Sequence, residues 1–145
     1  MTTIAYKDGV ISYDSRTVRG TVVMEDDCEK LQVVKGVGFI CTGATCDFDA
    51  LIAAYFGEPA TVPVEASGYA ITDGELWLVG HDDKTGIWKS KIDSSRVDAI
   101  GSGSPFALAA MDMGASAYQA VEMAARRDTN TGGKIRTVRV SREVG

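Results

Sequence analysis

The chain has 145 residues, 45% of them hydrophobic, which is enough for one buried core, so we expect a single domain over residues 1–145. Its 15 basic and 20 acidic residues give a formal net charge of -5 at pH 7, which argues against nucleic acid or an anionic membrane as the main partner. Three cysteines without a CxxC pair are typical of reduced thiols in a cytoplasmic protein, not of a disulfide framework.

The sequence also lacks the features expected of a secreted protein, of a membrane-spanning protein and of a histidine-rich metal protein. The N-terminus has no basic region followed by an apolar run, so we expect no signal peptide. No apolar stretch reaches the length of about 20 residues that a membrane-spanning helix needs. The single histidine, His81, excludes a multi-histidine metal site, and we expect neither a metal nor another cofactor.

The chain begins with strand patterns. Apolar and polar residues alternate over residues 2–14, and the pair Asp8-Gly9 is a strong signal for a type I′ hairpin turn. If Lys7 faces Val10 across that turn, the Asp14 region comes alongside Thr2 and Thr3, but strict alternation puts the side chains of Thr2 and Asp14 on opposite faces. A bulge or a third residue would be needed to join them.

Residues 19–43 are rich in Val, Thr and Ile and predict two further strands, with turns near residues 25–27 and 35–36. The period then changes to that of a helix, for which Gly57 is a plausible end. The apolar residues at helical spacing are Phe48, Leu51, Ile52, Tyr55 and Phe56.

After a connector over residues 58–64, residues 68–80 predict a second hairpin around another Asp-Gly pair, and residues 86–92 add a strand. The stretch "GSGSPFALAAMDMG" predicts a turn followed by a helix, with Ser104 as the N-cap and Pro105 at the first helical position.

Residues 116–128 predict a second helix with one face formed by Tyr118, Val121 and Ala125, and residues 133–144 predict a final strand. Hairpin turns dominate this order of elements and β-α-β alternation is absent. The order therefore favours an α+β layered domain with antiparallel sheets over a Rossmann-like sheet.

Thr2 is the first candidate for chemistry. If the initiator methionine is removed, the threonine carries its own base, because an α-amino group has a pKa of about 7.7–8.0. Amine and hydroxyl then form a known pairing of base and nucleophile on one residue. The alternative is an ordinary residue that favours the β conformation.

Three other groups of residues would take part in catalysis only if they lay beside the free amine and hydroxyl of Thr2. Lys30, held by Asp14, would lower the pKa of a nearby amine and stabilise alkoxide character on the hydroxyl. Gly43, between a strand and a helix, can present a backbone N–H to an oxyanion. Ser102 and Asp128 could hydrogen-bond a terminal amine. Taken separately, all of these also fit surface charges and plain turns.

Together these fragments resemble proteasome β-subunits and the bacterial peptidase HslV. The resemblance runs along nearly the whole chain and is carried by short motifs in a shared order, with a similar spacing from Asp14 to Lys30. The motifs are "MTTI" at the start, then "DSR", "TGATCD", "GSGSPFALAAMDMG" and "RDTNTGG".

The resemblance implies the fold of the N-terminal nucleophile hydrolases, a four-layer αββα sandwich with two antiparallel sheets. It implies a threonine peptidase in which Thr2 is the nucleophile and base, Asp14 and Lys30 are the supporting charge pair, and Gly43 supplies the oxyanion N–H. The residues implied to orient the terminus are Ser102, Asp128 and Thr131. Those implied to line the first specificity pocket, which would be small and mostly uncharged, are Thr17, Cys28, Gln32, Cys41 and Thr45.

The resemblance also implies peptide or unfolded protein as substrate, a cytoplasmic homo-oligomeric ring and an ATP-dependent unfoldase as partner. Activation would need only the removal of Met1, because no long propeptide precedes Thr2. Two other functions stay open: a small-amide amidohydrolase on the same fold, and a catalytically silent homologue that acts as a structural or assembly protein.

Overall fold

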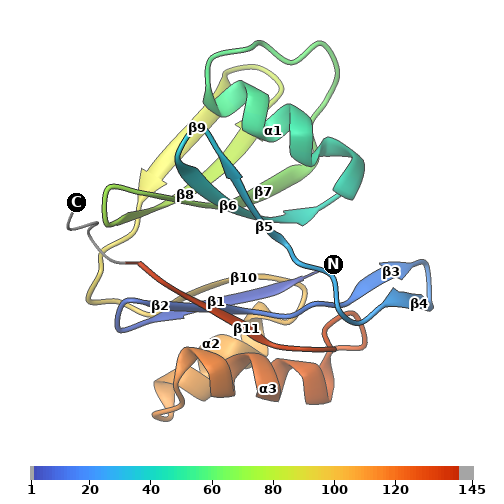
Figure 1. Ribbon diagram of the computed structural model, residues 1–145, viewed down its shortest axis with the longest axis vertical. Helices are drawn as coiled ribbons and strands as arrows, with labels where there is room; N and C mark the ends of the chain where they lie inside the picture. The colour runs from blue at the N-terminus through green and yellow to red at the C-terminus, as the bar shows by residue number, and fades with distance from the viewer. Residues whose placement is uncertain (1, 141–145) are drawn as a thin grey trace.

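A computed structural model of the chain describes residues 2–140 and shows four layers, with helices outside and two sheets between them (Figure 1). One sheet has the strand order β10-β1-β2-β11, with bounds Asp98–Gly101, Thr3–Lys7, Val10–Tyr13 and Arg136–Arg139. The other has the order β5-β6-β7-β8-β9, with bounds Leu31–Val34, Val37–Gly43, Ala66–Thr72, Glu75–Asp82 and Gly86–Lys91.

The helices cover the outer faces of the two sheets. α1 (Phe48–Tyr55), entered through a 3-10 turn at Thr45–Asp47, packs on the five-stranded sheet, and α2 (Ser104–Asp112) and α3 (Ala117–Arg127) pack on the four-stranded sheet. Neighbouring strands in both sheets are antiparallel. The expected α+β class and αββα sandwich are therefore confirmed.

Each boundary between layers holds its own apolar cluster, and the central strands of the two sheets, such as β1 and β6, are buried on both faces. In β1 successive side chains point to opposite faces of the sheet. Ile4 and Tyr6 face the opposite sheet, while Ala5 faces α2 and α3. In β6, Ile40 faces the other sheet, and Phe39 lies in the cluster under α1.

The predicted hairpin turns are present. Asp8 and Gly9 have φ values of 51° and 77°, the positive pair that a type I′ turn requires, and Asp73 and Gly74 repeat it at 51° and 72°. The predicted helix ends as expected near Gly57, which has a φ of 101°.

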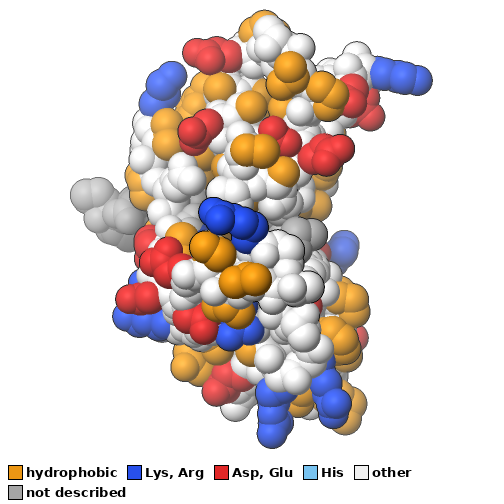
Figure 2. Space-filling model, turned by 90° about the vertical axis from the view of Figure 1, so that its right-hand side faces the viewer, with side chains coloured by type: hydrophobic (Ala, Val, Ile, Leu, Met, Phe, Trp, Pro, Cys, Tyr) orange, Lys and Arg blue, Asp and Glu red, His pale blue; other side chains and the backbone are white. Residues whose placement is uncertain are grey.

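The prediction of two strands over residues 19–43 is wrong, because the chain forms an additional short hairpin before β5. This hairpin, β3 (Thr17–Arg19) and β4 (Val22–Glu25), pairs only with itself among the described strands. It exposes hydrophobic side chains at mid-height on the side of the molecule shown in Figure 2; these are Val22, Val23 and Met24.

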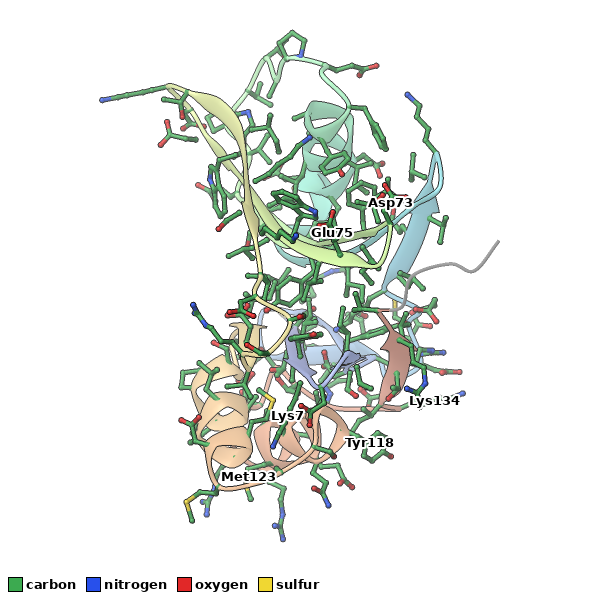
Figure 3. The ribbon with its side chains drawn as sticks, turned by 90° about the vertical axis from the view of Figure 1, so that its left-hand side faces the viewer. Lys7, Asp73, Glu75, Tyr118, Met123 and Lys134 are labelled. Carbon is green, nitrogen blue, oxygen red and sulfur yellow. The ribbon has the colours of Figure 1, made fainter. Side chains whose placement is uncertain are left out.

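Two details of the helices also differ from expectation. Ser104 is the first residue of α2, so Pro105 is the second, and Gly103 takes the N-cap position without a side-chain capping bond. The backbone N–H of Gly103 donates to the Thr3 hydroxyl at 3.1 Å. Tyr118 lies on the outer side of α3, 45% exposed, as does Met123 (Figure 3). Small residues form the buried face, namely Ala117, Ala120, Val121 and Ala124, and they let α3 approach the sheet closely.

The predicted final strand is β11; the part of that prediction beyond Val140 lies outside the described residues. Among residues 2–140, none of the helices is both long enough and apolar enough to cross a bilayer.

Candidate active site

Thr2 lies directly before β1 and is 4% exposed. Its carbonyl accepts a hydrogen bond from the Ser102 backbone N–H at 3.1 Å. This approach is so close that a Cβ on Gly101, whose φ is 101°, would lie 1.5 Å from the Thr2 carbonyl oxygen. Only glycine at position 101 allows the first residues and β10 to pack in this way.

Lys30 is the third residue that joins Thr2 to Asp14. Its ammonium donates to the Thr2 hydroxyl oxygen at 2.9 Å and to Asp14 Oδ1 at 2.8 Å. The side chain of Lys30 is 6% exposed and that of Asp14 is fully buried. A buried cation therefore lies against the threonine hydroxyl, held there by a buried carboxylate.

Main-chain donors fix the carboxylate of Asp14. Oδ1 also accepts from the Thr3 N–H at 3.2 Å, and Oδ2 accepts from the N–H groups of Gly132 at 2.9 Å and Arg16 at 3.4 Å. A buried charge is tolerated only when it is paired and hydrogen-bonded, and Asp14 meets both conditions. The orientation of Lys30 is thus set by three separate chain segments.

Burial lowers the pKa of Lys30, and the charge and hydrogen bond of Asp14 oppose that effect without cancelling it. An ammonium in this state has a strong field, because little water screens it. It can stabilise negative charge that develops on the Thr2 oxygen.

A second polar cluster lies around Asp128, directly after α3. Oδ2 of Asp128 accepts hydrogen bonds from the hydroxyls of Ser102 and Thr131, both at 2.6 Å. Partial burial acts to raise the pKa of Asp128, but the hydrogen bonds from these hydroxyls outweigh it and lower the pKa below the ordinary value.

The two clusters are connected by Thr3, a residue that the sequence analysis did not single out. Its hydroxyl lies 2.7 Å from the Thr131 hydroxyl oxygen, and its amide N–H donates to Asp14. The threonine pair at the start of the chain was the available signal, since Thr3 is fully buried and its hydroxyl needs partners.

The segment over residues 26–29, which carries no helix or strand of its own, is held from both sides by arginines. Arg16 Nε donates to Asp26 at 2.8 Å. Arg136 on β11 donates to the carbonyl of Cys28 at 3.2 Å and to Asp27 at 2.8 Å, and it also bonds Ser15 and pairs with Glu29. These contacts position the chain immediately before Lys30.

A cavity of about 130 Å³ opens beside Thr2. It brings together four of the five residues expected in the specificity pocket, along with the expected nucleophile, cation and oxyanion glycine. The lining includes Thr2, Thr17, Cys28, Lys30, Gln32, Gly43 and Thr45.

Cys41 is the expected pocket residue that the structure does not bring to this cavity. Its side chain is 2% exposed within the cluster under α1, where burial raises the pKa of the thiol to about 12. Phe48 both lines the cavity and packs on that cluster. Within the described part of the chain, no group of three or more His, Cys, Asp or Glu side chains is arranged to hold a metal ion.

Comparison with known proteins places this geometry in a structural context. No family profile matches the chain, and no curated protein matches it. Solved structures match over nearly the whole length. BPH from Thiobacillus denitrificans is 19% identical, with a TM-score of 0.70 and 99% of each chain covered.

The same protein in complex with epoxomicin is 20% identical, with a TM-score of 0.68 and 98% of each chain covered. HslV from Trypanosoma brucei is 19% identical, with a TM-score of 0.68, and the alignment covers 95% of this chain and 98% of that one. The chain therefore has an HslV-like proteasome β-subunit fold, the fold of the N-terminal nucleophile hydrolases.

Proposed function

We propose that this protein is a threonine peptidase of the proteasome/HslV type, which cleaves peptide bonds after removal of Met1 exposes the amine of Thr2. The observation that supports this most is the contact of 2.9 Å between the buried Lys30 ammonium and the Thr2 hydroxyl oxygen. A buried lysine is costly, and aiming it at a hydroxyl serves no obvious purpose in stability.

The chemistry is acyl transfer. The Thr2 hydroxyl oxygen attacks the carbonyl carbon of the scissile bond, while the free amine takes the hydroxyl proton, directly or through a water. The oxyanion that forms is stabilised by the backbone N–H of Gly43. The amine then gives its proton to the leaving nitrogen, the C–N bond breaks, and an ester on Thr2 remains. Water, deprotonated by the same amine, hydrolyses that ester.

Each polar cluster has a part in this scheme. The charge of Lys30 lowers the pKa of the new amine and favours alkoxide character on the Thr2 oxygen. Asp14 holds Lys30 in place. Ser102, Asp128 and Thr131 form the hydrogen-bonded group that orients the freed terminus.

The substrate is a peptide or an unfolded protein, and the cavity beside Thr2 receives the side chain on the acyl side of the bond. This cavity is small, but Arg16 and Glu29 line it together with Lys30, so it is more charged than the family resemblance implied. Thr17, Cys28, Gln32 and Thr45 are the side chains proposed to contact the substrate there. We extend the proposal to a cytoplasmic homo-oligomeric ring that encloses the active sites and receives substrate from an ATP-dependent unfoldase.

Covalent labelling tests the proposal. The purified protein is first weighed intact, and a species lacking Met1 is required. It is then treated with epoxomicin, the compound that the BPH structure holds. We expect one molecule of label per chain, mapped to Thr2, together with hydrolysis of short peptides.

Thr2→Ala should remove both the label and the activity, whereas Thr61→Ala, in an exposed bend, should change neither. Hydrolysis of small amides but not of peptides would favour the amidohydrolase. Ring-sized particles that take up no label would favour a structural homologue, and either result would overturn the peptidase.

A further inference from the structure

A second and larger cavity, of about 510 Å³, shares Gly43 with the cavity beside Thr2. Its walls come from the end of β6, from β7, β8 and β9, and from the end of β10 with the turn that follows it. The residues that matter for its chemistry are Gly43, Ser67, His81, Trp88, Gly101 and Ser102. The proposed acyl transfer does not use His81 or Trp88.

Trp88 gives this cavity a flat aromatic wall. Its ring packs on the bare backbone of Gly80 so closely that a Cβ at position 80 would lie 2.2 Å from a ring carbon. With that contact in place the side chain is still 41% exposed. An aromatic surface that is supported from behind and open in front favours another flat ring, because offset-stacked and edge-to-face pairs are the preferred contacts.

His81 adds a polar group without a partner. Its side chain is 8% exposed, and its Nδ1 atom is buried with no hydrogen bond to any group within residues 2–140. The carboxylate of Asp83 lies 4.0 Å from Nδ1, which is too long for a hydrogen bond. Nδ1 itself is closed off from the cavity, but the imidazole lines the cavity and makes no hydrogen bond within residues 2–140, so its other ring nitrogen is left for a polar group of a ligand.

The position of the cavity indicates which part of a substrate it holds. The cavity beside Thr2 is lined by Thr2 itself and by Lys30, so it suits the acyl side of the bond. The second cavity is walled by Gly101 and Ser102, where Ser102 binds the Thr2 main chain and also Asp128. Because Ser102 and Asp128 are the residues proposed to orient the freed amine, the second cavity lies on the side where that amine hands its proton to the leaving nitrogen.

We infer that the second cavity binds the residue directly after the scissile bond, with preference for an aromatic side chain that carries a hydrogen-bonding group, tyrosine above phenylalanine. The inference rests on the proposed peptidase function and names its leaving-group specificity. The ring of the bound residue packs on Trp88, and its hydroxyl pairs with His81.

The test uses peptides that share one acyl side and differ only in the residue after the cleaved bond: Tyr, Phe, Leu or Ala. Cleavage at that bond is followed by mass spectrometry. We expect kcat/KM to be about five-fold higher for the tyrosine peptide than for the leucine peptide, in line with the size of an aromatic pair contact, and the phenylalanine peptide to lie between them.

Variants assign the preference to its residues. Trp88→Leu should bring the kcat/KM values of the Tyr, Phe and Leu peptides together, each taken relative to the alanine peptide with the same variant, and Trp88→Phe should keep part of the preference. His81→Leu should remove the advantage of tyrosine over phenylalanine only. Equal kcat/KM across the wild-type series, or a preference unchanged in Trp88→Leu, would overturn the inference.

The two proposals fail in different ways. Labelling of Thr2 and cleavage of the alanine peptide without any aromatic preference would reject the leaving-group specificity alone. Absence of both labelling and cleavage would reject the peptidase function and the specificity with it.

Discussion

The two sheets of this protein bury very different side chains. The five-stranded sheet packs on α1 through an apolar cluster that includes Phe39, Leu51 and Val79. The four-stranded sheet and the loops at its Thr2 end hold nearly all of the fully buried polar residues of the described chain. These are Thr2, Thr3, Ser12, Asp14, Ser15 and Thr131, and Thr42 alone belongs to the other sheet.

Apolar burial and the burial of charged groups contribute differently to the free energy of folding. Burying apolar surface contributes roughly 25 cal/mol per Å², so the cluster under α1 stabilises the fold directly. Taking a carboxylate and an ammonium out of water costs several kcal/mol per ion, and their attraction offsets this only with good geometry. The ion pair of Asp14 and Lys30 is therefore poor evidence for stability and good evidence for chemistry. Function in this molecule therefore depends on the polar end of the four-stranded sheet, whereas the cluster under α1 serves stability alone.

Replacing the buried lysine should give the largest effect. Lys30→Met removes the cation beside the Thr2 hydroxyl and leaves Asp14 as an unpaired buried charge, so we expect about 3–5 kcal/mol of lost stability. We expect kcat/KM on a peptide to fall about 10³-fold, as when a preorganised electrostatic contact is removed. Denaturant unfolding and peptide hydrolysis measure the two effects.

Lys91→Met is the matched control. Lys91 is 56% exposed and pairs with Glu75 at the surface, so its loss should cost less than about 1 kcal/mol and leave activity unchanged. The double variant Asp14→Asn/Lys30→Met removes both charges but keeps an oxygen acceptor for the main chain. It should recover part of the stability and none of the activity. Normal turnover by Lys30→Met would refute the division between the layers.

The apolar layer should show the opposite pattern. Leu51→Ala empties a fully buried position under α1 and should cost about 3 kcal/mol, with kcat/KM per folded molecule changed less than about two-fold. Val33→Ala, at a position that is 69% exposed on β5, is the control and should change stability by less than about 0.5 kcal/mol. A large loss of activity in folded Leu51→Ala would mean that the layers are coupled.

Local signals predicted much of this architecture. The pair Asp8-Gly9 fixed the first hairpin because both residues must take positive φ, and the register of that turn brings Asp14 beside Thr3. The helical spacing around Leu51 predicted α1, since it is the buried stripe of that helix. The order of the short motifs carried the family resemblance, and that resemblance implied which elements far apart in the chain lie together.

Other features depended on contacts that a single sequence does not contain. β10 was not predicted, since its pairing with β1 joins segments about 95 residues apart. The face of α3 was misjudged because the sheet selects small residues, so that Tyr118 turns outward. That Cys41 would lie in the cluster under α1 and outside the cavity lining follows only from how α1 packs.

A smaller effect is expected from the support of Lys30. Arg136→Gln removes the fork that holds residues 27–29, and we expect kcat to fall about five-fold with a stability loss of about 1 kcal/mol, the size of a few lost surface hydrogen bonds. Arg136→Lys should restore little, since a point charge cannot replace a planar fork. Arg139→Gln, exposed on the same strand, is the control. An unchanged pH–rate profile and kcat in Arg136→Gln would show that the segment positions itself.

The smallest effect concerns the acid side of the stability curve. Partial burial raises the pKa of Asp128. The hydrogen bonds, including those from Ser102 and Thr131, lower it by more than burial raises it, so the pKa in the folded state lies below the ordinary 3.8. Between these two values the unfolded state binds more protons than the folded state, so the free energy of unfolding falls as the pH drops through this window. Above 3.8 the contribution is fully present.

Urea unfolding at several pH values from about 2 to 6 measures the slope of that loss. Asp128→Asn should flatten it, Thr131→Val should flatten it in part, and Thr131→Ser should leave it as in the wild type, because serine keeps the hydroxyl that donates to Asp128. Leu51→Ala should lower the stability by the same amount at every pH, because no proton is linked to that position. If Asp128→Asn kept the full acid slope, the polar cluster would contribute no pH dependence, and the contrast between the two layers would be one of packing alone.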